Sequence, residues 1–226
     1  FLSGYLKEIN KKEALKYLGY KGGEVEDKIL RDIDQCSEII IKNALPKVIY
    51  RVFDIESDLS FSGTNFSPKG NDIAEMLKDC GRAIIMAATI GGEIDGVIRR
   101  REVDDMYLAL MLDSCASCAI ENVCDNFQNE LEERLFNENL YLTDRFSPGY
   151  GDMPFEQQRE ICEILNTSKT IGVSLNESGI MIPRKSVTAI MGIAQKPQKK
   201  RFRGCEYCSM FENCDFRKGG ITCGKC

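Results

Sequence analysis

The chain has 226 residues, of which 43% are hydrophobic and 29% are charged, a balance typical of a soluble globular protein with one or two domains. Its 35 acidic residues slightly outnumber the 30 basic ones, and it contains 11 cysteines but no histidine. Because imidazole is the usual base near neutral pH and a common zinc ligand, the composition excludes Ser-His-Asp triads, Cys-His nucleophiles, HExxH zinc sites and Cys2His2 fingers.

The charge and hydropathy patterns lead us to expect a cytoplasmic protein. The acidic balance argues against nucleic acid as a partner of the whole chain. The longest apolar run, over residues 83–90, is far shorter than the ~20 residues of a membrane span, and no signal peptide is visible. We therefore expect no membrane attachment. The odd number of cysteines favours metal binding and free thiols over a disulfide framework.

The periodicity of apolar residues predicts both helices and strands. In chain order it predicts helices over 13–18 and 26–45, strands over 48–53 and 59–61, a helix over 72–79, a strand over 82–90, and helices over 93–101 and about 107–136. An irregular segment over 137–154 precedes a helix over 154–165, a strand over 171–175, a turn over 176–179 and a strand over 187–193. This order is not a repeating βαβ pattern, so the sequence predicts an α+β fold with a mixed or antiparallel twisted sheet flanked by helices.

A change in composition predicts the division of the chain into two parts. Residues 1–195 contain all the predicted helices and strands and an excess of acidic residues. Residues 196–226 form a basic linker followed by a cysteine-rich tail. The basic run from Lys196 to Arg203 is usually a solvated linker, but it could also dock an acidic flavodoxin, ferredoxin or corrinoid protein.

The irregular segment contains an unusual combination of residues, Arg145-Phe146-Ser147-Pro148-Gly149-Tyr150-Gly151-Asp152. The arginine offers a fork for a carboxylate, and the proline–glycine bend allows the backbone to approach a ligand closely. Taken alone, such a segment is more often a surface loop with an exposed arginine. The sequence that follows, IGVSLNESGIMIPRKSVTAIMGI, changes that interpretation.

Together the two stretches contain the patterns RxxPGY, IGxxLxES and MxPxxSV in this order. From about Asp113 to Ile193 the chain therefore resembles the activation domain of cobalamin-dependent methionine synthase, in its free-standing, short-chain form. The resemblance implies a curved α+β module that binds S-adenosylmethionine (AdoMet) and presses it against a corrinoid. In that family, one electron and the AdoMet methyl group restore methylcobalamin from the inactive Co(II) state.

The resemblance also implies which residues of the loop bind AdoMet. Arg145 corresponds to the family arginine that holds the AdoMet carboxylate. Ser147, Gly149 and Tyr150 would line the methionine and ribose region. Further residues match the family and are interpreted as supporting the loop, namely Glu177, Ser178, Met181, Pro183, Ser186 and Val187.

Two acidic residues complete the predicted AdoMet site. Glu121, in the long helix, matches a family glutamate that faces the site, and Glu138 lies one position away from a second family acid. Carboxylates suit this role because the AdoMet sulfonium is positively charged and would be costly to bury unpaired. We predict no catalytic residue, because methyl transfer from a sulfonium to reduced cobalt requires no base from the protein.

The tail contains a second pattern, Cys205-x2-Cys208-x5-Cys214-x8-Cys223-x2-Cys226. Two CxxC pairs can bring four sulfurs to one metal, so we predict a metal site formed by these cysteines. Zinc in a structural knuckle and an iron–sulfur cluster are both open; the fifth cysteine and the need for an electron near the corrin slightly favour the cluster. By contrast, Cys115, Cys118 and Cys124 on the long helix are interpreted as packing residues, as are Cys36, Cys80 and Cys162.

The leading hypothesis is an accessory component that binds AdoMet and supports reductive methylation of a corrinoid protein. The corrinoid would be supplied by a partner, methionine synthase or a related methyltransferase, because the DxHxxG pattern of cobalamin carriers needs a histidine. A flavodoxin or ferredoxin could donate the electron. The alternative is a metal-binding interaction or redox module of a corrinoid methyltransferase system that no longer uses AdoMet.

Overall fold

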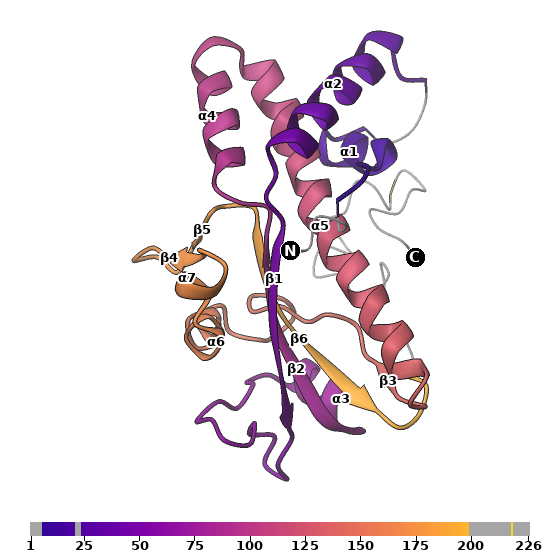
Figure 1. Cartoon of the computed structure of the whole chain (residues 1–226), viewed down its shortest axis with the longest axis vertical. Helices are drawn as coiled ribbons and strands as arrows, with labels where there is room; N and C mark the ends of the chain where they lie inside the picture. The colour runs from indigo at the N-terminus through magenta and orange to yellow at the C-terminus, as the bar shows by residue number, and fades with distance from the viewer. Residues whose placement is uncertain (1–5, 21–23, 199–217, 219–226) are drawn as a thin grey trace.

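The structure, a computed structural model, describes residues 6–20, 24–198 and 218 (Figure 1). Its main sheet has the strand order β1-β2-β6-β3, and every neighbouring pair is antiparallel. The strands are β1 (Lys47–Asp54), β2 (Cys80–Thr89), β3 (Tyr141–Leu142) and β6 (Ser186–Ala194). A separate hairpin pairs β4 (Ser174–Leu175) with β5 (Met181–Ile182). Helices combined with an antiparallel sheet confirm the predicted α+β class.

The central strand β2 is apolar along nearly its whole length because both faces of the sheet are covered. Side chains alternate across a strand, so Ile84 and Met86 enter one core while Ala83 and Ile85 enter the other. All four are buried. Each fully buried isoleucine or methionine contributes roughly 1.5–3 kcal/mol, so the two cores hold the layers together from both sides of one strand.

Four helices cover the first face of the sheet (Figure 1). They are α1 (Lys11–Tyr17), α2 (Asp27–Asn43), α4 (Glu93–Asp104) and α5 (Met106–Phe136). The long helix α5 packs against α1, α2 and α4 and contributes Cys115, Cys118 and Cys124 to the core. The interpretation of these cysteines as packing residues is confirmed, because each is fully buried.

The second face is covered by α3 (Asn71–Leu77), α6 (Gln157–Leu165) and the loops around them. Its core contains several aromatic side chains: Phe61 packs edge-on against Phe66, and Phe146 lies in the same cluster. A short helix, α7 (Thr167–Thr170), follows α6 directly. The sequence prediction placed most of these elements correctly, with differences confined to short segments.

Three short predictions were wrong in whole or in part. Residues 59–61 form no strand; Leu59 has a φ of 65°, and only Phe61 pairs, in an isolated bridge with Ile55. The helix after Pro154 begins at Gln157, following a turn. The strand predicted over 171–175 is reduced to Ser174–Leu175, because hydrogen bonds between Thr167 and Val173 hold the preceding residues against α7.

Within the described residues, none of the helices combines the length and the apolar character needed to cross a bilayer.

The start of α3 depends on a residue far along the chain. This helix has no side-chain cap of its own, but the Asp152 carboxylate accepts hydrogen bonds from the backbone N–H groups of Asn71 (2.6 Å) and Asp72 (3.1 Å). These bonds satisfy two of the donors that a helix N-terminus leaves unpaired. They also lower the pKa of Asp152 below its usual 3.8. Asp152 therefore ties the loop that follows Arg145 to α3.

We predict that Asp152→Ala lowers the melting temperature at pH 7 by roughly 2–4 °C, the change expected for one lost cap in a domain of this size. Because the pKa of Asp152 is depressed on folding, its contribution is present above the unfolded pKa and is lost as pH falls through the folded pKa. The difference between variant and native protein should therefore shrink below about pH 4 in thermal melts. Asp79→Ala, which removes an exposed carboxylate in the turn after α3, is the control. A pH-independent difference would contradict the capping role.

Candidate functional site

The segment RFSPGYGD forms a compact loop that is bonded directly to the sheet. Phe146 and Ile190 of β6 exchange two backbone hydrogen bonds, with N···O distances of 2.9 and 2.8 Å. Beyond Phe146 the chain turns back on itself, since Tyr150 N donates to Ser147 O and Gly149 N donates to Met153 O. Gly149 adopts a φ of 85°, a conformation that favours glycine. The loop is thus a defined turn anchored to β6.

The pairing with β6 sends neighbouring side chains to opposite faces of the sheet. Phe146 is buried in the core of the second face, where its ring packs edge-on against Tyr150 with centroids 5.4 Å apart. Arg145 points the other way, toward α5, and its side chain is only 14% exposed. Arg145 is therefore not the exposed surface arginine that such a segment, taken alone, would predict, because its guanidinium lies against a helix. That it binds a ligand carboxylate stays a prediction.

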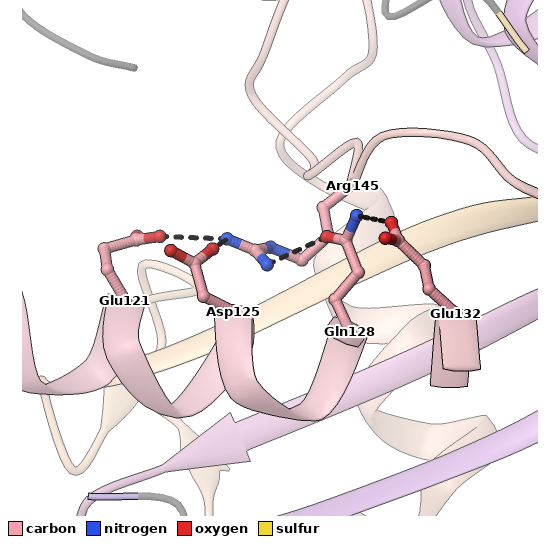
Figure 2. A network of polar contacts seen from close by, with 5 residues as sticks. All are labelled: Glu121, Asp125, Gln128, Glu132 and Arg145. Atoms are coloured by element: carbon pink, nitrogen blue, oxygen red, sulfur yellow. Dashed lines mark hydrogen bonds and ion pairs between the residues drawn. The ribbon is translucent and has the colours of Figure 1, made fainter. Parts of the chain in front are cut away.

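Arg145 contacts three side chains on successive turns of α5 (Figure 2). Its Nη2 donates to Asp125 Oδ1 at 2.8 Å and to Glu121 Oε2 at 3.2 Å. Its Nη1 donates to Gln128 Oε1 at 3.0 Å. The Gln128 amide in turn donates from Nε2 to Glu132 Oε1 at 2.8 Å. Because Gln128 has an acceptor on one side and a donor on the other, its amide orientation is fixed by the network.

Burial and charge compete at this cluster. Burial raises the pKa of Glu121, and the nearby Asp125 carboxylate raises it further, while Arg145 lowers it in part. Burial opposes the charge on Arg145, but Cys124, Asp125 and Glu121 outweigh that effect, so its pKa is raised. Tyr17 of α1 has a pKa raised to about 12, by burial first and then by Glu121 and other nearby anionic groups. The cluster therefore combines one cation with two partly exposed carboxylates.

The contacts of Arg145 belong to a longer polar stripe on α5. The stripe follows the helical repeat and consists of Asp113, Ser117, Glu121, Asp125, Gln128 and Glu132. At its N-terminal end a second cation lies against it: Lys185, from the loop before β6, contacts Asp113 Oδ1 at 2.8 Å and Ser117 Oγ at 2.9 Å. The Lys185 side chain is 13% exposed. Lys185 thus ties the β5–β6 loop to α5, much as Arg145 ties the RFSPGYGD loop to it.

The cysteines beside this stripe are thiols rather than thiolates. Burial raises the pKa of Cys118 and of Cys124 to about 12, in the case of Cys124 despite the nearby Arg145. A protonated, buried thiol is neither a good nucleophile nor a metal ligand. Among the residues that the structure describes, no group of three or more Cys, Asp or Glu side chains could hold a metal ion.

The structure brings part of the predicted AdoMet site together. Arg145 and Glu121 are in direct contact. Ser147, Gly149 and Tyr150 lie in the turn that follows Arg145 in the chain. Glu138 lies apart, exposed in the turn after α5, and its side chain makes no hydrogen bond or ion pair with the other five described residues. The predicted metal ligands Cys205, Cys208, Cys214, Cys223 and Cys226 lie outside the described residues.

The sequence analysis missed Asp125, Gln128 and Lys185. Asp125 and Gln128 follow Glu121 by four and seven positions, a spacing that places them on the same side of a helix. That spacing could have identified both residues once Glu121 was singled out. No comparable signal existed for Lys185, because its contact with Asp113 joins segments far apart in the sequence.

Chemically, the cluster suits a ligand that carries both signs of charge. A guanidinium can bind a carboxylate through a forked pair of hydrogen bonds. The carboxylates of Glu121 and Asp125, whose side chains are 43% and 32% exposed, can pair with an ammonium or a sulfonium. An amino acid or a derivative of one has both features.

Comparison with protein families gives a match over residues 78–206 to the family described as "Vitamin B12 dependent methionine synthase, activation domain". This match extends beyond the boundary at residue 195 that composition suggested. Among solved structures, the chain is similar to one titled "Crystal Structure of the MetH Reactivation Domain bound to AdoHcy", with a TM-score of 0.61 and 17% sequence identity. The similarity covers 95% of this chain and 82% of that one, and at this identity it establishes the fold. No curated protein matches the chain.

At Gly151 the loop lies close to Asp72 and to the Phe146 ring. Its φ is 54°, and a Cβ there would lie 2.5 Å from Asp72 Oδ2 and 3.2 Å from the Phe146 ring. Gly151→Ala should therefore add the cost of moving the Asp72 carboxylate and of crowding the Phe146 ring to the strain of roughly 1–2 kcal/mol that a left-handed conformation imposes on alanine. Gly63→Ala is a matched control, because Gly63 has a φ of 75° but open space around it. Denaturant melts should show a larger loss for Gly151→Ala; equal losses would mean that the close approach does not constrain the loop.

Proposed function

This chain belongs to the family of vitamin B12-dependent methionine synthase activation domains, and we propose that it binds AdoMet and supports the reductive methylation of an oxidised corrinoid on a partner protein. The observation that carries the proposal is the cluster in which Arg145, from the RxxPGY loop, donates hydrogen bonds to Glu121 and Asp125 of α5. The cluster offers a guanidinium to the ligand carboxylate and carboxylates to its ammonium and sulfonium groups.

The chain's own residues would bind and orient AdoMet. Arg145 would hold the carboxylate, and the turn containing Ser147, Gly149 and Tyr150 would contact the methionine and ribose portions, the assignment that the family resemblance implies. Glu121 would face the cationic end of the ligand. Because the turn is hydrogen-bonded to β6 and Asp152 ties it to α3, the loop that contains Arg145, Ser147, Gly149 and Tyr150 is held in place before the ligand arrives.

The reaction requires no base from the protein. A one-electron donor reduces Co(II) to Co(I), which then attacks the AdoMet methyl carbon. The carbon–sulfur bond breaks, its electron pair leaves with S-adenosylhomocysteine, and methyl-Co(III) is formed. The contribution of the chain is proximity: it fixes the methyl group where the reduced cobalt can reach it, which lowers the entropic part of the barrier.

The partners follow from the chemistry. The chain has no histidine to serve as a lower cobalt ligand, so we assign the corrinoid to a partner, a cobalamin-dependent methionine synthase or a related methyltransferase. The electron would come from a flavodoxin or ferredoxin. We also retain the division into an AdoMet-binding part, residues 1–195, and a basic, metal-binding part, residues 196–226, as a proposal that rests on composition and cysteine spacing.

We predict that Arg145→Ala weakens AdoMet binding about 10- to 100-fold in calorimetry, because a charge-assisted pair with the carboxylate is lost. Arg134→Ala is the matched control, since Arg134 pairs with Glu130 on the same helix but is exposed and makes no described contact with the cluster. The control should bind like the native protein. Absence of AdoMet binding by the native protein at millimolar ligand would refute the proposed function.

The complementary measurement is the conversion of Co(II) to methyl-Co(III) on candidate corrinoid proteins, followed by absorption. Conversion should depend on AdoMet, on an electron donor and on this protein, and should fall with Arg145→Ala. Conversion that is equally fast without the protein would exclude the proposed role.

The cysteine tail makes a separate prediction. The full chain, purified without oxygen, should retain either iron with a broad visible absorption band or about one colourless zinc ion per chain. Cys205→Ser and Cys208→Ser should release the metal, whereas Cys36→Ala, which alters a buried core thiol, should not. A full chain that retains neither metal would disprove the tail site while leaving the AdoMet proposal intact.

A further inference from the structure

We propose that Asp125 is the fixed partner that positions Arg145, and that Glu121 is exchanged from Arg145 to the cationic end of the ligand when AdoMet binds. The inference rests on the proposed function and assigns different tasks to two carboxylates that touch the same nitrogen. Asp125 is therefore a positioning residue for ligand recognition, and Glu121 is a mobile counter-ion.

The N–H groups of Arg145 that could hold a ligand carboxylate are already occupied in part. An arginine can grip a carboxylate through either of two forked pairs of N–H groups, and both pairs use the nitrogen Nη2. Nη2 has two hydrogens and already contacts two acceptors, Glu121 Oε2 and Asp125 Oδ1. The remaining terminal nitrogen, Nη1, donates to Gln128. A ligand carboxylate can therefore be held by a fork only if one of the two carboxylates leaves Nη2.

Geometry and exposure indicate which carboxylate leaves. The contact of Arg145 with Glu121 is longer than that with Asp125, 3.2 Å against 2.8 Å. The Glu121 side chain is also more exposed, 43% against 32%, so less packing opposes its movement. The shorter contact from the more enclosed Asp125 is the one that stays and holds the guanidinium in plane with the incoming carboxylate.

The exchange keeps opposite charges together throughout. The ligand carboxylate replaces Glu121 at Arg145, and the ligand cation replaces Arg145 at Glu121, so neither side chain is left as an unpaired charge. Arg145, Glu121 and Asp125 together carry a net charge of about −1 when all are ionised, and AdoMet carries about +1. The cluster therefore complements AdoMet better than it complements S-adenosylhomocysteine, which lacks the sulfonium charge.

The test compares three ligands on variants of the full chain. AdoMet has the carboxylate, the ammonium and the sulfonium; S-adenosylhomocysteine has the carboxylate and the ammonium but no sulfonium; 5′-methylthioadenosine has none of the three. Asp125→Asn should weaken AdoMet and S-adenosylhomocysteine about tenfold each while leaving 5′-methylthioadenosine within about twofold. Glu121→Gln should weaken AdoMet more than S-adenosylhomocysteine, and so reduce the preference of the protein for AdoMet.

Asp113→Asn is the matched control, because Asp113 is a carboxylate of similar exposure on the same helix that pairs with Lys185 instead of Arg145. It should leave the ratios of the three affinities unchanged, and thermal melts should show that all variants are folded. Equal weakening of all three ligands by Asp125→Asn would reduce Asp125 to a structural role, and tighter AdoMet binding would make it a competitor; either result overturns the inference. Native protein that binds no AdoMet would remove the proposed function and this inference with it, whereas native binding with unchanged selectivity in the variants would remove the inference alone.

Discussion

The backbone pair between Phe146 and Ile190 determines where the side chains of the RFSPGYGD loop lie. Because adjacent residues of an extended segment point to opposite sides, this one pair sends Phe146 into the core of the second face and Arg145 toward α5. A shift of the pairing by one residue would bury the guanidinium among aromatic rings and expose the phenylalanine, at a large cost in desolvation. The buried Phe146 side chain thus fixes the register that places Arg145 against α5.

That anchor connects the fold to the site in a second way. Ile190 belongs to β6, whose neighbour β2 contributes side chains to both cores, so the position of the loop depends on a part of the sheet that is buried on both faces. On the other side, the Asp152 carboxylate binds the same loop to α3. Lys185 links the segment before β6 to α5, the helix that Arg145 contacts. The loop and the stripe on α5 are consequently held by separate contacts, and the cluster between them is partly exposed.

Much of the fold could be predicted from the sequence because burial imposes a period on long elements. The two-sided burial of β2 and the helical repeat of α5 both leave strong patterns, and both elements were identified nearly to their ends. The strand predicted around Leu59 was wrong because two apolar residues on either side of a serine, Leu59 and Phe61, do not distinguish a strand from a turn whose phenylalanine is buried. Likewise, Ile171 and Val173 alternate as strand residues would, but hydrogen bonds to Thr167 decide their conformation.

The candidate site, like the fold, was predictable from the sequence only in part. Arg145 and Glu121 could be predicted from the resemblance between motifs, whereas Asp125 and Gln128, on the same side of α5, are identified by their contacts with Arg145. The sequence could not show that Glu121 and Asp125 share one nitrogen of Arg145, because this depends on which N–H group of Arg145 lies against which oxygen. The absence of histidine acquires meaning at this point: the pKa of Arg145 is raised, so its guanidinium stays charged across the neutral range, and recognition would depend on matching charges rather than on moving protons. A site of this kind selects a ligand by the number and placement of its charges, the property that separates AdoMet from the product left after its methyl group has been transferred.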